Sequence, residues 1–141
     1  MPVRTSEATW KGTLREGNGE MVVGDGVFKG PFTYATRFEE QPGTNPEELL
    51  GAAHAGCFAM SVSSRLTAAG HPPKSIHASA KVHLGKVEGK SRITKIELDC
   101  ETSVDGVSQE KFLELAEDAK INCPVSAALT GVEITLNARL V

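Results

Sequence analysis

Among the side chains that could carry chemistry, Cys57 has the most unusual surroundings. It lies in the stretch NPEELLGAAHAGCFAM, residues 45–60, where Ala and Gly leave space around the sulfur. A thiolate in such a place can act as a nucleophile. The alternative is a small core residue, because free cysteine is among the most buried residue types. Cys57 shares one mainly apolar helical stripe with Leu50, Ala53, Met60 and Ser64. Periodicity alone therefore favours the core.

Gly56 precedes Cys57 inside the same helical pattern. Glycine in a helix interior costs about 1 kcal/mol relative to alanine, so we expect a compensating role. Either another element packs closely on Gly56, or the missing side chain opens access to the Cys57 sulfur.

The other two cysteines differ from Cys57 in their local patterns. Cys123 stands directly before Pro124, at or beside a helix N-cap, where free N–H groups and the helix dipole favour a thiolate. A plain turn cysteine is the alternative. Cys57, in the middle of an apolar helix, should have a raised pKa unless a cation lies beside it. Cys100 alternates with apolar residues on one strand face and is predicted to be a core residue.

Three further polar residues are candidates for supporting roles. Arg37, in TYATRFEE, is either a surface charge on a strand or the cation that Cys57 needs. Glu47 occupies the second helical position, where a negative charge gains about 0.3–1 kcal/mol from the helix dipole. His54 lies one turn before Cys57 and is either a surface or packed histidine or the base of a Cys–His hydrolase. The hydrolase lacks an evident third group.

Metal and disulfide frameworks are not expected. The chain has no CxxC, HxxxH or HExxH pattern, and its three cysteines are too few for a disulfide scaffold. We therefore expect no structural zinc site.

A long helix is predicted to position Cys57. Asn45 is a good N-cap, Pro46 falls at the first helical position, and Glu48 completes a capping-box pattern. Gly70 and the two prolines after it end the helix near Ala69.

The remaining predicted elements give an α+β pattern rather than alternating βαβ units. A chain of 141 residues suits one domain, residues 1–141. The predicted strands are Glu7–Leu14, Glu20–Val23, Phe32–Phe38, Ile76–Leu84, Arg92–Val104 and Val132–Leu140, and the predicted helices are one that begins at Ser108 and a short one from Cys123 to near Gly131.

Composition excludes several classes of partner. The net charge is −3 with no basic run, so neither nucleic acid nor an anionic membrane surface is an expected partner. No apolar run approaches the roughly 20 residues that span a bilayer. The first residues lack an apolar core after their positive charge, so we expect no secretory signal and a cytoplasmic location.

Three separated segments, TRFEE, GTNPEELLGAAHAGCFAMSVS and INCPVSAAL, resemble the OsmC/Ohr family of organic hydroperoxide reductases, and the OsmC branch most closely. The resemblance covers nearly the full chain, from the strand with Trp10 to the last strand. It implies an α+β, OsmC-like fold in which β-sheets wrap around a long central helix, within an interwoven homodimer.

The resemblance also implies a thiol peroxidase mechanism without a cofactor. Cys57 matches the peroxidatic cysteine and Cys123 the resolving cysteine. Arg37 matches the arginine that pairs with the thiolate, and Glu47 the glutamate that orients that arginine. An organic hydroperoxide would be reduced to an alcohol through a Cys57 sulfenic acid and a Cys57–Cys123 disulfide. An external dithiol, typically a lipoyl group, would then recycle the enzyme.

One spacing bears on how these residues meet. Glu47 and Cys57 are ten residues apart, which is about 15 Å on one continuous helix. Either the chain bends, or Glu47 serves a Cys57 across a subunit interface in a homodimer.

The alternative function is a non-catalytic small-molecule-binding domain that uses the same apolar interface pocket.

Overall fold

The computed structural model of the chain describes residues 1–141 and divides them into two compact units, residues 1–49 and 50–141. Both contain strands and helices, which confirms the α+β class. The single domain over residues 1–141 stays a prediction. None of the helices combines the length and apolar character needed to cross a membrane.

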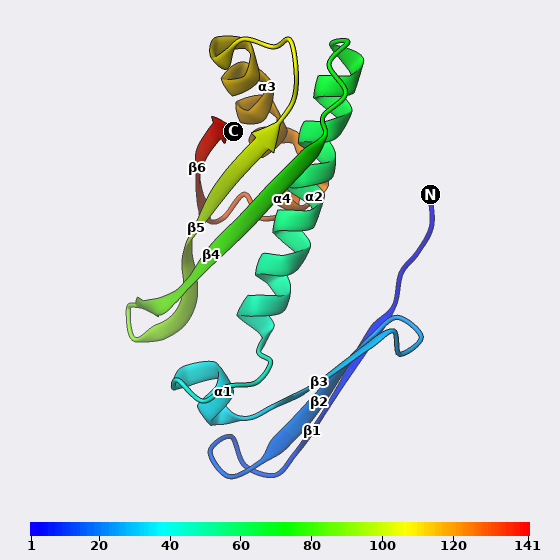
Figure 1. Ribbon diagram of the computed structural model, residues 1–141. Helices are drawn as coiled ribbons and strands as arrows, with labels where there is room; N and C mark the ends of the chain where they lie inside the picture. The colour runs from blue at the N-terminus through cyan, green and yellow to red at the C-terminus, as the bar shows by residue number, and fades with distance from the viewer. The chain divides into compact units, whose positions relative to one another are not determined.

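The first unit contains an antiparallel three-stranded sheet in the order β1-β2-β3 (Figure 1). Trp10 and Phe32, on the two outer strands, are both paired with Gly19 of the central strand, and their ring centroids are 5.2 Å apart. A Cβ atom on Gly19 would lie 2.7 Å from each ring, so glycine is required there. The strands are β1 (Ser6–Lys11), β2 (Asn18–Val23) and β3 (Phe28–Phe32).

The predicted strand Phe32–Phe38 is wrong. β3 ends at Phe32, and Tyr34–Phe38 forms a short helix, α1. The Thr36 N–H donates to Thr33 Oγ1 (3.2 Å), and the Thr33 N–H donates to Thr36 Oγ1 (2.9 Å). This reciprocal cap satisfies two backbone donors and starts a helix despite the strand-like aromatic alternation.

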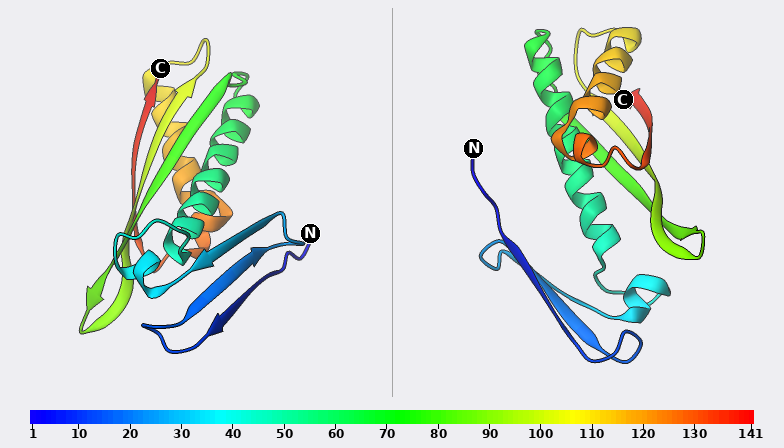
Figure 2. Two further views of the ribbon diagram at one scale, coloured as in Figure 1. Left: turned by 60° about the horizontal axis from the view of Figure 1, so that its bottom comes forward. Right: turned by 180° about the vertical axis from the view of Figure 1, so that it is seen from behind.

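The second unit is built on a sheet in the order β4-β5-β6, with β4 antiparallel and β6 parallel to β5. Helices α2 and α3 lie against one face of this sheet (Figure 2). The predicted last helix ends earlier than Gly131, because Leu129 already caps it. The elements are α2 (Pro46–Ala68), β4 (Ser75–Val87), β5 (Lys90–Ser103), α3 (Gln109–Asn122), α4 (Pro124–Ala128) and β6 (Glu133–Leu140).

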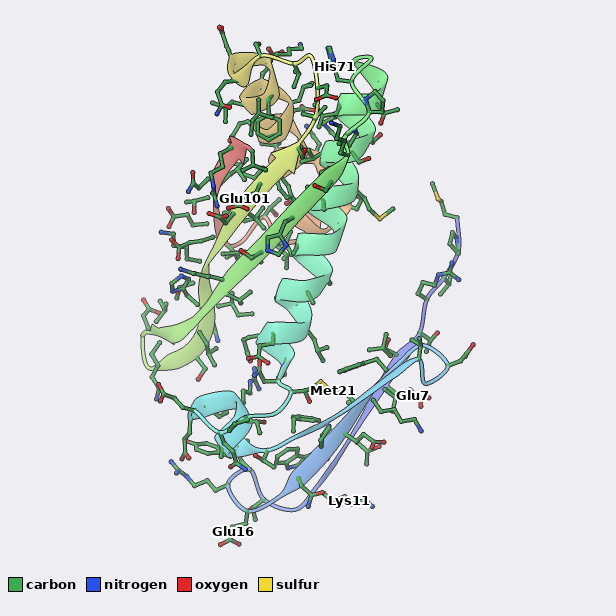
Figure 3. All side chains as sticks on the ribbon, viewed as in Figure 1. Glu7, Lys11, Glu16, Met21, His71 and Glu101 are labelled. Atoms are coloured by element: carbon green, nitrogen blue, oxygen red, sulfur yellow. The ribbon has the colours of Figure 1, made fainter.

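The predicted start and end of α2 are confirmed. The Glu48 N–H donates to Asn45 Oδ1 (2.8 Å), although the exposed Glu48 side chain makes no return bond to the cap. At the other end Gly70 has φ +88°. The next residue, His71, donates its N–H to Leu66 O (2.8 Å) at the end of the helix (Figure 3).

The buried face of α2 is not the predicted stripe through Cys57. Its side chains pack with Ile96 and Cys100 of β5 and with Phe112 of α3. Large apolar side chains gain most from burial, so they turn this face inward and leave Cys57 half-buried at its edge. Met60 is 76% exposed, whereas Cys100 is fully buried, which confirms its core assignment. The buried α2 residues of the second unit are Gly51, His54, Phe58, Val62 and Leu66.

Replacement of Gly56 by alanine should raise the free energy of unfolding by about 1 kcal/mol, because alanine favours a helix. A Cβ atom at Gly56 would meet nothing within 4 Å. Gly51→Ala is the matched control on the same helix, since its Cβ would lie 3.3 Å from Val82 Cγ2 and 3.4 Å from Ala80 O. Urea denaturation should show a smaller gain, or a loss, for Gly51→Ala. Destabilisation by Gly56→Ala would contradict the prediction.

Candidate active site

Cys57 opens onto a mostly apolar concavity of about 550 Å³ in the second unit. Because the sulfur lies at the edge of the buried face of α2, it touches both the core and this concavity. Small or narrow side chains beside it leave room for a ligand. The lining residues are Cys57, Met60, Ser61, Ser64, Arg65, Asn122 and Pro124.

Cys123 is the junction between two helices and is fully buried. Its N–H donates to Ala119 O (2.9 Å) and so completes α3. Its sulfur accepts a hydrogen bond from the Ser126 N–H (3.3 Å) and so caps α4, with Pro124 at the first helical position. The predicted position of Cys123 at a helix start is therefore confirmed, and the cap fixes the direction of its thiol.

The structure brings Cys57 and Cys123 together. Cys57 packs against the core cluster that contains Cys123, and both the Cys123 thiol and the Val125 backbone are near enough to shift the pKa of Cys57. Burial is the main cause that raises the pKa of Cys57; the Val125 backbone opposes it, and the Cys123 thiol adds to it. No cation contributes, so the raised pKa matches the expectation for an unpaired, partly buried thiol.

Ser126 and His54 extend this pair into a buried chain of polar groups. The Cys123 thiol donates to Ser126 Oγ (3.1 Å), which lies 2.7 Å from His54 Nε2. His54 is fully buried, and burial lowers its pKa, so the ring is neutral. His54 bonds to Ser126 and not to Cys57, so the structure gives no basis for a Cys57–His54 hydrolase pair.

Ser126 was not identified from the sequence. The signal was its place three residues after Cys123, since the third residue of a helix is the one that bonds with its cap. His54 is separated from Ser126 by 72 residues, so no local pattern links them.

The first unit brings Arg37 and Glu47 together. Arg37 lies on α1 rather than on the predicted strand. Its Nε and Nη2 atoms both donate to Glu47 Oε1, at 3.1 and 2.9 Å. The start of α2 is held to α1 because Asn45 Nδ2 donates to Thr36 O (3.1 Å). Two capped helix ends therefore position this ion pair.

The ion pair keeps unused hydrogen-bonding capacity. Glu47 Oε2 is buried and has no hydrogen-bond partner. The Arg37 side chain is 37% exposed, and its guanidinium lies 5.1 Å from the centre of the Phe38 ring. Arg37 can therefore accept a further anionic partner while Glu47 holds it in place.

Known proteins resemble this chain in both sequence and structure. The sequence pattern of the family described as OsmC-like protein matches residues 38–137. Peroxiredoxin OsmC of Escherichia coli (strain K12) is 44% identical over 138 residues, which cover 97% of this chain and 96% of that protein. The protein of that name from Shigella flexneri matches to the same extent.

Two solved structures share the fold over nearly their full lengths. The organic hydroperoxide resistance protein OhrB of Bacillus subtilis has a TM-score of 0.71 and 27% identity, covering 96% of this chain and 98% of that one. An organic hydroperoxide resistance protein from Elizabethkingia anophelis has a TM-score of 0.74 and 26% identity, covering 99% of each chain. These likenesses confirm the predicted OsmC-like fold.

The pattern match spans most of the chain, and the identity to the E. coli protein extends it to nearly every residue. Both agree with the resemblance carried by the segments around Arg37, Cys57 and Cys123. This chain belongs to the OsmC-like protein family.

Proposed function

We propose that this chain is a peroxiredoxin-type thiol peroxidase that reduces organic hydroperoxides to alcohols. One observation carries the proposal: the Cys57 thiol opens onto a mostly apolar concavity and packs against the core cluster that contains the Cys123 thiol. The names of the relatives, a peroxiredoxin and organic hydroperoxide resistance proteins, support the same activity.

The first step forms a sulfenic acid at Cys57. The thiolate attacks one oxygen of ROOH, the O–O bond breaks, and the departing alkoxide takes a proton to become an alcohol. The apolar walls favour an organic R group over hydrogen peroxide, at about 0.8 kcal/mol for each buried CH₂ group. Met60 and Pro124 are wall residues that an alkyl group would contact.

The second step joins Cys57 to Cys123. The sulfenic acid condenses with the neighbouring thiol, which forms a disulfide and releases water. An external dithiol of the lipoyl type then restores both thiols. Such a donor requires a reducing compartment, which supports the cytoplasm as the proposed location.

Cys57 needs a cation to ionise, because burial raises its pKa. Arg65 lines the concavity, but its guanidinium already donates to Asp118 and to Ser61. We assign the role to Arg37, held by Glu47 and with capacity for another anion. In that role it would stabilise the Cys57 thiolate and the charge that develops on the peroxide oxygens.

We propose that Arg37 and Glu47 act on Cys57 of a second chain in an interwoven homodimer. The helix α2 is uninterrupted from Pro46 to Ala68, so ten residues along it correspond to about 15 Å. A contiguous set of small or apolar residues on α2 is exposed and available for such a contact. The set is Ala52, Ala53, Gly56 and Met60.

Cys57→Ser should reduce the consumption of cumene hydroperoxide with dithiothreitol to the uncatalysed background, because the nucleophile is lost. Without any reductant, Cys123→Ser should consume about a single equivalent and then stop at a sulfenic acid that dimedone traps. Cys100→Ala is the control, since Cys100 lies in the core and should affect stability rather than turnover. Peroxide consumption by colorimetry and intact-protein mass spectrometry measure these outcomes.

Full turnover by Cys57→Ser would rule out the mechanism. If the wild-type protein consumes no peroxide, and thiol alkylation leaves the binding of an apolar dye intact, the alternative of a non-catalytic binding domain would be supported instead.

A mixed dimer of a Cys57→Ser chain and an Arg37→Ala chain should regain about half of the wild-type activity if the site is built from two chains. One of its two sites then combines an intact Cys57 with an intact Arg37. If both residues come from the same chain, neither site is intact and the mixed dimer stays inactive. Differently tagged chains, copurified and assayed, distinguish the two results, and a monomer in sedimentation would refute the dimer.

A further inference from the structure

The polar chain behind Cys123 ends on a group that can accept a proton. Ser126 Oγ accepts the hydrogen bond from the Cys123 thiol, so its own proton is free to be donated to His54 Nε2. The ring proton is then on Nδ1, which is buried and has no partner. A histidine held only for structural reasons would normally satisfy both ring nitrogens when buried.

We propose that His54 is a positioning residue that accepts, through Ser126, the proton which Cys123 must lose to attack the Cys57 sulfenic acid. This inference rests on the proposed function for its disulfide step. His54 and Ser126 provide a route for the proton of the Cys123 thiol, which is fully buried and cannot pass this proton directly to bulk water.

Protons and electrons balance in this step. Cys123 gives its proton to Ser126 Oγ while Ser126 gives its own to His54 Nε2. The Cys123 sulfur attacks the Cys57 sulfur, an S–S bond forms, and the S–O bond of the sulfenic acid breaks. The thiol sulfur is oxidised and the sulfenic sulfur reduced. The leaving hydroxide takes a proton from solvent in the concavity onto which Cys57 opens and departs as water, and His54 afterwards loses its extra proton to solvent.

The surroundings of His54 keep its ring neutral and able to accept a proton. Burial is the only cause that lowers its pKa, and no charged side chain contributes. The core of the second unit contains three cysteines: Cys57 on the same helix, Cys123 at the start of α4, and Cys100 on β5. The neutral form therefore persists below the usual histidine pKa of about 6.5.

The test separates the attack by Cys123 from the reaction of Cys57. The reduced protein is mixed with 5,5′-dithiobis(2-nitrobenzoic acid), which forms a mixed disulfide at Cys57 and releases thionitrobenzoate. Attack by Cys123 then releases the second thionitrobenzoate, and its rate is followed by absorbance. The same variants are mixed with a single equivalent of cumene hydroperoxide, and the sulfenic acid and disulfide are quantified by rapid quench and mass spectrometry.

Ser126→Ala and His54→Gln should leave the first step nearly unchanged and slow the second by about tenfold or more near neutral pH, as expected for loss of a proton acceptor. Glutamine can keep a hydrogen bond to Ser126 but cannot take a proton. Ser126→Thr, which keeps the hydroxyl, should restore the second step. The double variant should be no slower than either single variant, because both interrupt one route.

The dependence of the second-step rate on pH distinguishes proton acceptance by His54 from a purely structural role. In the wild type the rate of the second step should stay level through pH 6.5 and fall only at lower pH, because burial lowers the pKa of His54 below its usual range. In both variants the rate should rise by about tenfold per pH unit, because solvent must now ionise the thiol.

Equal slowing of both steps, or an unchanged pH profile, would overturn the inference. The absence of peroxide consumption with a normal second thionitrobenzoate release would count against the proposed function only. If Ser126→Ala fails to fold, as judged by thermal unfolding, the comparison of His54→Gln with the wild type decides the question.

Discussion

A hydrogen bond of 2.7 Å between His54 Nε2 and Ser126 Oγ holds the start of α4 against the middle of α2. Both residues are buried, so breaking the bond would leave polar groups without water or a partner. Since Ser126 also bonds with the Cys123 sulfur, the same contact determines where that thiol lies. The proximity of Cys57 and Cys123 thus depends on an interaction to which Cys57 itself does not contribute.

The helix α2 performs two tasks with two different faces. Phe58, Val62 and Leu66 give the second unit much of its core, and this face has no space for a ligand. The neighbouring face carries small, exposed residues. Cys57 lies at the border between the two faces. There its sulfur is partly shielded from water and still reaches the concavity. A position one residue earlier or later would have lost one of these properties.

Local signals in the sequence were sufficient for the elements with strong boundaries. Asn45 and Gly70 predicted both ends of α2, and Ser108 predicted the start of α3, because caps act over a few residues. The segment Tyr34–Phe38 forms a helix although its alternating aromatic residues are typical of a strand, and its cap uses a second threonine in place of the usual Glu or Gln.

The candidate site could be predicted only in part from the sequence. In a helix rich in alanine several stripes look equally apolar, so periodicity placed Cys57 in the core and Met60 beside it. The nominated roles of Cys57 and Cys123 came from the family resemblance. The link from His54 to Ser126 spans 72 residues and exists only once α4 has packed on α2.

Cys123 serves at once as a reagent and as a structural cap, and these two uses compete. While reduced, its sulfur accepts the Ser126 N–H and stabilises the first turn of α4, a contribution of about 1 kcal/mol for a good cap. In the proposed cycle, a sulfur that turns toward Cys57 gives up that bond, so oxidation loosens α4. By thermodynamic linkage, the helix favours the reduced thiol and makes the disulfide easier to reduce. The five-residue helix α4 would in this way favour the return of the enzyme to its reduced state after each turnover.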